Sequence, residues 1–285
     1  MTDEARFPAE AAKGTDEARF PAEAAKGTDE ARFPADAAAR ADLGTPRSNG
    51  SSGQVFGEDV RAKAKEIIAR YPQSRSALLP LLHLVQSVEG HVSQAGIQFC
   101  AEQLDLGIAE VSAVVTFYTM YKRRPCGEHL VSVCTNTLCA ALGGDDIYAA
   151  LKEELGVGHE ETAGEAGSPG SVTLEHAECL AACDLAPVLQ VNYEFFDRQT
   201  PDSAVELVRA LRRGERPNPT RGAPLTNFRT AELQLAGFFE GRDADVAGPS
   251  AAEETLRGAQ LAAERGWTAP AMPDDAPLPP VPEKK

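Results

Sequence analysis

Two close cysteine pairs constrain the fold of this chain more than any other feature. The chain holds six cysteines in 285 residues, and four of them form the doublets Cys134/Cys139 and Cys179/Cys183. With four and three residues between the partners, both sulfurs of one loop can reach one metal. The two loops, about forty residues apart, are therefore expected to meet around either one tetrahedral metal or a two-iron cluster.

Three chemistries are compatible with paired cysteines. Zinc accepts both spacings, although zinc loops usually belong to small modules without another core, and this chain is 42 % hydrophobic. Thiol–disulfide exchange usually uses a gap of two residues, which neither pair has. A [2Fe–2S] cluster needs four thiolates and close approach of the backbone, which the small or apolar residues beside the cysteines would allow: Leu138, Ala140, Leu180, Ala181 and Ala182. The spacing favours the cluster and leaves zinc and redox thiols as alternatives.

Composition excludes several classes of partner. The net charge is −15 and the pI about 4.8, which argues against nucleic acid and against anionic membrane surfaces. The longest apolar stretch, Leu78–Val85, is interrupted by Pro80 and His83 and falls short of the roughly 20 residues that span a bilayer. The N-terminus resembles neither a secretory signal nor a transit peptide. We therefore expect a reducing cytoplasm and no membrane insertion, so that the paired cysteines are metal-binding or catalytic and not disulfide-bonded.

Both ends of the chain are of low complexity. Residues 1–54 form an arm in which Thr2–Gly14 and Thr15–Gly27 are identical repeats of thirteen residues, followed by a linker; this composition predicts disorder. Residues 214–285 form a tail rich in Pro, Ala and acids, which is expected to be disordered, above all in its last eighteen residues with their repeated Pro. Within it, Glu232–Phe239 and Ala251–Arg265 are possible short helices with too few apolar residues for a core of their own.

Residues 55–124 are predicted to form a four-helix module. Apolar residues recur at helical spacing over Asp59–Tyr71 and Ser76–Glu89, in a third helix capped by Ser93, and in a fourth that starts near Ile108. Cys100 falls on the apolar face of the third helix and is expected in the core.

Residues 125–213 are predicted to form a second, α+β domain. Strands are expected over His129–Val133, Ser171–Leu174, Pro187–Tyr193 and Phe195–Asp197, helices over Asp145–Leu155 and Pro201–Arg212, and a loop over Val157–Gly170. The order is close to that of a thioredoxin-like sandwich, with both cysteine pairs on loops at strand ends.

The local sequence around these elements resembles a known family. The stretches are Ser76–Gln86, Thr116–Tyr121, His129–Gly144 and Glu178–Asn192. They are similar to the [2Fe–2S] subunit, often called E, of bacterial NADH:quinone oxidoreductase (respiratory complex I), a thioredoxin-like [2Fe–2S] ferredoxin. The resemblance covers roughly residues 55–213. It implies a helical bundle followed by the ferredoxin domain, with Cys134 and Cys139 on one iron and Cys179 and Cys183 on the other.

The resemblance also implies a function. The cluster would exchange single electrons with a flavin, and FMN and NADH would bind the neighbouring subunit, beside further iron–sulfur subunits. The chain itself would carry no catalytic residue, and it would lie peripherally on the cytoplasmic face of the bacterial membrane as part of the complex. Two alternatives are a related diaphorase subunit of a soluble NAD-dependent hydrogenase or formate dehydrogenase, and a structural zinc adaptor.

A few further residues bear on the site. His176 lies near the second pair but is not expected to be a ligand, because four cysteines already complete the site. Cys126, between Pro125 and Gly127, is expected on a turn and not as a ligand. Glu178 and Asp184 add negative charge beside the second pair, which predicts a low reduction potential. Trp267, the one tryptophan, is either an anchor on a partner subunit or part of an ordered turn.

Overall fold

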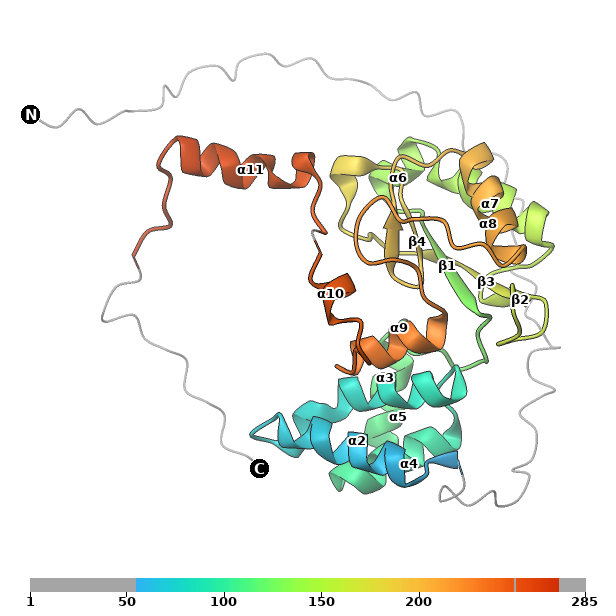
Figure 1. The fold of residues 1–285 in the computed structure, drawn as a ribbon, viewed down its shortest axis with the longest axis vertical. Coiled ribbons are helices and arrows are strands. Elements are labelled where there is room, and N and C mark those ends of the chain that lie inside the picture. Colours follow the sequence, from blue (N-terminus) through green and yellow to red (C-terminus); the bar gives the residue numbers. More distant parts are fainter. Residues whose placement is uncertain (1–54, 249, 272–285) are drawn as a thin grey trace, which may run out of the picture. The chain divides into compact units, whose positions relative to one another are not determined.

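The computed structural model describes residues 55–248 and 250–271. The arm of residues 1–54, which is predicted to be disordered, and the last part of the tail lie outside this range. The first described helices, shown in Figure 1, are α2 (Glu58–Ala69), α3 (Leu78–Glu89), α4 (Gln94–Leu104) and α5 (Ile108–Phe117), with the 3₁₀ turn η1 (Ser74–Ala77) before α3. The four predicted helices are all present, within a few residues of their expected bounds.

Local sequence signals explain where these helices begin and end. Pro80 lies in the first turn of α3, where a backbone N–H would have no intrahelical acceptor, so its absence in proline costs little. Gly90 ends α3 with a φ of 76°, a conformation that glycine adopts without strain. The Ser93 side chain accepts a hydrogen bond from the Gly96 N–H and so caps α4 as predicted.

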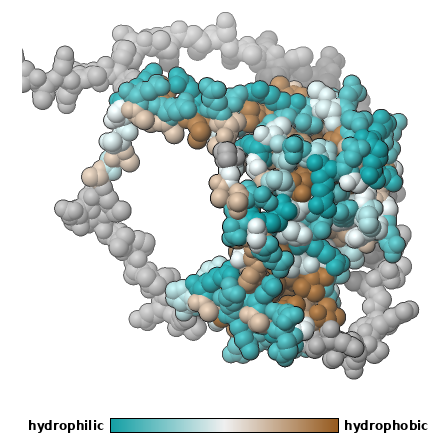
Figure 2. All heavy atoms as spheres, viewed as in Figure 1, coloured by the Kyte–Doolittle hydropathy of each residue, from teal (hydrophilic) through white to brown (hydrophobic). Residues whose placement is uncertain are grey.

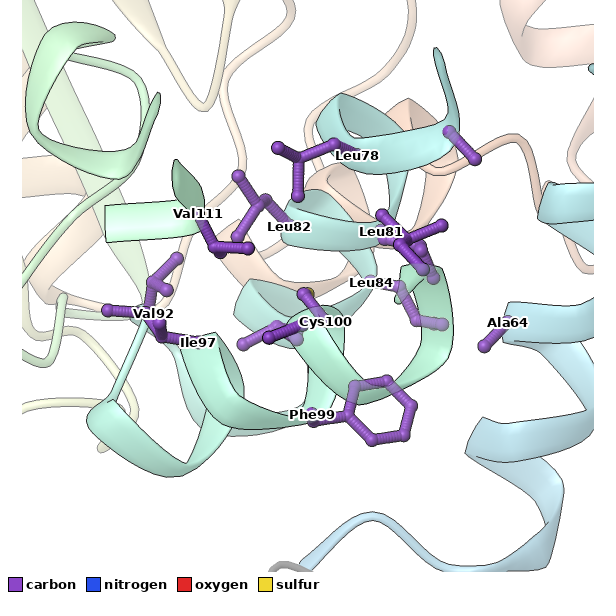
Figure 3. Close-up of a cluster of buried hydrophobic side chains, with 14 of the residues drawn as sticks. Ala64, Leu78, Leu81, Leu82, Leu84, Val92, Ile97, Phe99, Cys100 and Val111 are labelled. Carbon is purple, nitrogen blue, oxygen red and sulfur yellow. The ribbon is translucent and has the colours of Figure 1, made fainter. Parts of the chain in front are cut away.

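The four helices share one hydrophobic core. Figure 3 shows Leu81, Leu82, Phe99 and Val111 gathered between them, with Cys100 among these side chains. Cys100 is fully buried, which confirms its predicted place in the core.

The second part is an α+β domain built on a mixed five-stranded sheet. The strands are β1 (His129–Cys134), β2 (Glu161–Ala163), β3 (Val172–Ala177), β4 (Leu189–Val191) and β5 (Glu194–Phe196), in the order β2-β3-β1-β4-β5. β1 and β3 are parallel and the other pairs antiparallel. Helices α7 (Gly144–Leu155) and α8 (Pro201–Arg212) bury their apolar side chains together with Val131 and Val133 of β1. The predicted fold class is thereby confirmed.

Two short elements were not predicted. β2 falls in the region Val157–Gly170, which was expected to be a loop, and it pairs with β3; there the hydroxyls of Thr162 and Thr173 lie 2.7 Å apart. The five-residue helix α6 (Thr137–Ala141) carries Cys139. Both elements are too short to show a periodic pattern, so they are determined by their tertiary neighbours.

The region after residue 213 contains α9 (Phe228–Leu235), α10 (Asp243–Val246) and α11 (Glu253–Glu264). α9 contacts α3 and buries Phe228 and Glu232. One Glu232 oxygen accepts a hydrogen bond from the Tyr193 hydroxyl at 2.7 Å, and the other lies 2.6 Å from His83 Nδ1. α9 therefore needs no core of its own, because it packs against α3 and bonds to side chains that come earlier in the chain. α11 has no buried residue.

Candidate iron–sulfur site

The four paired cysteines lie at one end of the sheet. Cys134 is the last residue of β1 and pairs in register with Ala177, the last residue of the parallel strand β3. Parallel strands end at the same edge, so the loops that follow them are neighbours. All four cysteines line one cavity of about 250 Å³, together with Asn136, Thr137, Leu138 and Ala141. The structure thus brings together all four predicted ligands.

The first pair is buried and held by the backbone. Cys134 and Cys139 are each 2 % exposed. The Cys134 N–H donates to the Val188 carbonyl at 3.1 Å. A Cβ on Gly144 would lie 2.6 Å from the Cys134 carbonyl oxygen and 2.9 Å from that of Cys139. Glycine is therefore needed here to let α7 approach this loop.

Burial also changes the chemistry of the first pair. It raises the pKa of the Cys139 thiol to about 11, with a further contribution from the neighbouring Cys134. A metal binds the thiolate, so binding at this position must displace a proton.

The second pair is exposed and lies on an irregular loop. The Sγ atoms of Cys179 and Cys183 are 3.7 Å apart. Two thiolates bound tetrahedrally at about 2.3 Å from one metal would be about 3.8 Å apart, so this separation fits two ligands of one ion. Ala181, between them, has a φ of 57°, and Cys183 begins the 3₁₀ turn η2 (Cys183–Leu185). The hydrogen bond with Cys179 raises the pKa of the Cys183 thiol.

The surroundings fit a two-iron cluster. Ala182, Leu185 and Val188 pack with Cys134 and Cys139 in one buried apolar cluster. Four sulfurs in two pairs around one cavity are the donor set that such a cluster requires. Over residues 55–248 and 250–271, no three His, Cys, Asp or Glu side chains are arranged to hold a single metal ion.

The other residues singled out by the sequence lie elsewhere. His176 stacks on His159 with 4.2 Å between ring centroids, and Cys126 is buried with Leu130 and Phe228. Trp267 is 59 % exposed, and the Arg265 guanidinium lies 5.0 Å from its ring centroid.

Two supporting residues were not predicted from the sequence. Asn136 caps α6 through the Thr137 N–H, and its Nδ2 donates to Glu178 at 2.9 Å, so it connects the two cysteine loops. An Asn followed by a short helix is a recognisable capping signal. Its partner Glu178 and the crowding at Gly144 emerge only from the fold.

Comparison with known proteins places the chain. Residues 64–212 match the thioredoxin-like [2Fe–2S] ferredoxin family. The chain therefore belongs to this family, whose cofactor is a [2Fe–2S] cluster, and the resemblance inferred from the sequence is confirmed.

Several similar proteins are E subunits of bacterial NADH-quinone oxidoreductases. The chain is 56 % identical to the NADH-quinone oxidoreductase subunits E of Mycobacterium bovis and Mycobacterium tuberculosis, over 81 % of this chain and 88 % of theirs. It is 37 % identical to that of Rickettsia bellii, over 52 % of this chain and 89 % of the relative. A solved NAD+-reducing [NiFe]-hydrogenase aligns with a TM-score of 0.40 at 14 % identity, over 47 % of this chain and 22 % of that one, a likeness that supports no inference.

Among the helices of the two described ranges, none is both long enough and apolar enough to cross a bilayer.

Proposed function

We propose that this chain is the E subunit of a bacterial NADH:quinone oxidoreductase and that Cys134, Cys139, Cys179 and Cys183 hold its one [2Fe–2S] cluster. The observation that carries the proposal is the 56 % identity to mycobacterial subunits of that name over most of both chains. The shared cavity of the four cysteines supports the ligand assignment. Residues 55–124 would be the helical module and residues 125–213 the ferredoxin domain, between the arm of residues 1–54 and the tail of residues 214–285.

The role of the chain is to hold a one-electron site. When bound, the cluster accepts and gives up single electrons. The buried first pair would hold one iron inside the domain, and the exposed second pair would hold the other iron on the side accessible to a partner's flavin. Glu178 and Asp184 place negative charge there, which disfavours reduction and predicts a low potential.

The partners follow from this role. FMN and NADH would bind the adjacent subunit, further iron–sulfur subunits would accept the electrons, and the assembly would lie at the cytoplasmic face of the membrane. The complex oxidises NADH and reduces quinone, and this chain contributes no catalytic residue.

Purification through a tag on the full chain, from both the soluble fraction and the solubilised membranes of its own cells, tests the assignment. We expect the flavin-bearing subunit and subunits of the membrane arm to co-purify, with NADH:quinone activity. Recovery of a hydrogenase or formate dehydrogenase large subunit instead would overturn the proposal in favour of a diaphorase.

A further inference from the structure

The C-terminal helix α11 lies against the loop that carries the second cysteine pair. The family match ends at residue 212, so α11 belongs to a part of the chain beyond the family's shared domain. The first turn of α11, a helix labelled in Figure 1, contacts η2, whose first residue is Cys183. We propose that α11 is a strap that positions this cysteine loop, with Thr255 and Glu254 as its positioning residues. The inference rests on the ligand assignment proposed above.

Three kinds of contact join α11 to the site. The Thr255 hydroxyl donates a hydrogen bond to the carboxylate of Asp184, the residue next to Cys183. The Glu254 carboxylate pairs with the Arg198 guanidinium. The backbone N–H of Arg198 in turn donates to the Leu185 carbonyl at 2.9 Å. Just before the helix, Ala252 packs against the apolar group that includes Cys134 and Cys139.

The second cysteine loop has features that additional contacts from α11 would stabilise. Cys179, Cys183 and Asp184 are exposed, and Ala181 holds a left-handed conformation that a residue with a Cβ disfavours. α11 in turn buries no residue. Figure 2 shows hydrophilic side chains along one edge of α11 and paler, more apolar ones along the other. Because α11 buries no residue and the two cysteines of the loop are exposed, the polar contacts between helix and loop would order both segments.

Two consequences follow for the cluster. A loop without its strap opens more often, so iron should leave the site faster. The Asp184 carboxylate would also lose a hydrogen-bond donor that offsets its charge. Uncompensated negative charge beside Cys183 disfavours reduction, so the midpoint potential should become more negative.

Thr255→Val in the full chain tests the strap, because valine keeps the shape of threonine and removes the hydroxyl. We expect iron release to a chelator to be roughly two- to tenfold faster, the effect of losing one hydrogen bond, and the midpoint potential to shift to a more negative value. Thr255→Ser keeps the hydroxyl and should restore both values. The matched control is Glu264→Gln, which breaks the Arg257–Glu264 pair of the same helix and should change neither.

Hydrogen exchange in the cluster-free full chain provides a second readout. The Leu185 and Ala186 N–H groups donate within the loop, to Ala182 and Cys183, and should exchange faster in Thr255→Val. Unchanged exchange at these amides, or wild-type iron release and potential in this variant, would overturn the strap while leaving the ligand assignment intact. A wild-type chain that binds no iron would instead overturn the ligand assignment and the strap with it.

Discussion

The two cysteine loops, proposed to share one cluster, are held in place in different ways. Cys134 and Cys139 are buried, and a strand, a short helix and the close approach of Gly144 hold them. Cys179 and Cys183 are exposed on an irregular loop, and Asp184 of this loop accepts a hydrogen bond from Thr255 of α11, outside the family's shared domain. The ferredoxin fold thus buries one half of the site, whereas the other half is exposed and, in the strap proposal, is positioned by contacts from distant sequence.

Removal of a ligand should have the largest effect, and it should be similar in both loops. Cys179→Ser is expected to abolish or strongly distort the visible absorbance of the cluster, because each iron needs both of its thiolates. Cys139→Ser should do the same. Cys100→Ser, in the helical core and away from the site, should keep the spectrum. A normal spectrum in Cys179→Ser would contradict the ligand assignment.

Gly144→Ala should distinguish the two loops, because it perturbs only the packing of the first. Its methyl group would collide with backbone atoms of Cys134 and Cys139, and such overpacking typically costs about 1–3 kcal/mol. Chemical denaturation and iron content should both show the loss.

The matched control is Gly258→Ala in α11, where a Cβ would meet no atom within 4 Å. It should leave iron content unchanged. Equal iron content in the two variants would refute the tight packing at the first loop.

Mild acid should lower the stability of the folded chain through His129, in the strand that leads to the first cysteine pair. His129 begins β1 and is buried, and burial lowers the pKa of its imidazole, while Glu128 opposes and Arg216 adds to this shift. Below the ordinary histidine pKa of about 6.5, the unfolded chain binds more protons than the folded one. Stability should therefore rise with pH through this range, by at most about 1.4 kcal/mol per pH unit for one group.

Thermal unfolding of the full chain between about pH 5 and 7 measures this dependence on either side of the histidine pKa. His129→Gln should flatten it relative to wild type, whereas His91→Gln, at a partly exposed position, should keep it. An unchanged slope in His129→Gln would show that other groups cause the dependence.

Asn136→Asp should have the smallest effect, because it alters an exposed bridge between the loops. Aspartate keeps the cap on Thr137 but replaces the donor to Glu178 with a like charge. We expect a stability change within about 0.5 kcal/mol and a midpoint potential shifted to a more negative value. Adding Glu178→Gln should reverse the shift, and its persistence would show that the bridge is not the cause.

Local signals explain how much of this could be predicted from the sequence. The bounds Pro201–Arg212 of α8 were predicted correctly, because Thr200 caps the helix, Pro201 starts it and its apolar residues recur at helical spacing. The spacing of the four cysteines predicted that their two loops meet, and all four line one cavity. β2 and α6 were missed because short elements depend on their neighbours. The Thr255–Asp184 contact joins residues 71 positions apart, and no pattern in the sequence indicates it.

The most direct test of the central claim is iron, zinc and acid-labile sulfide analysis of the anaerobically purified chain, with an EPR spectrum after dithionite reduction. One [2Fe–2S] cluster held by two cysteine pairs predicts two irons and two sulfides per chain and a spin-half signal in the reduced state. One zinc, no sulfide and no signal would contradict it and would favour the structural zinc adaptor.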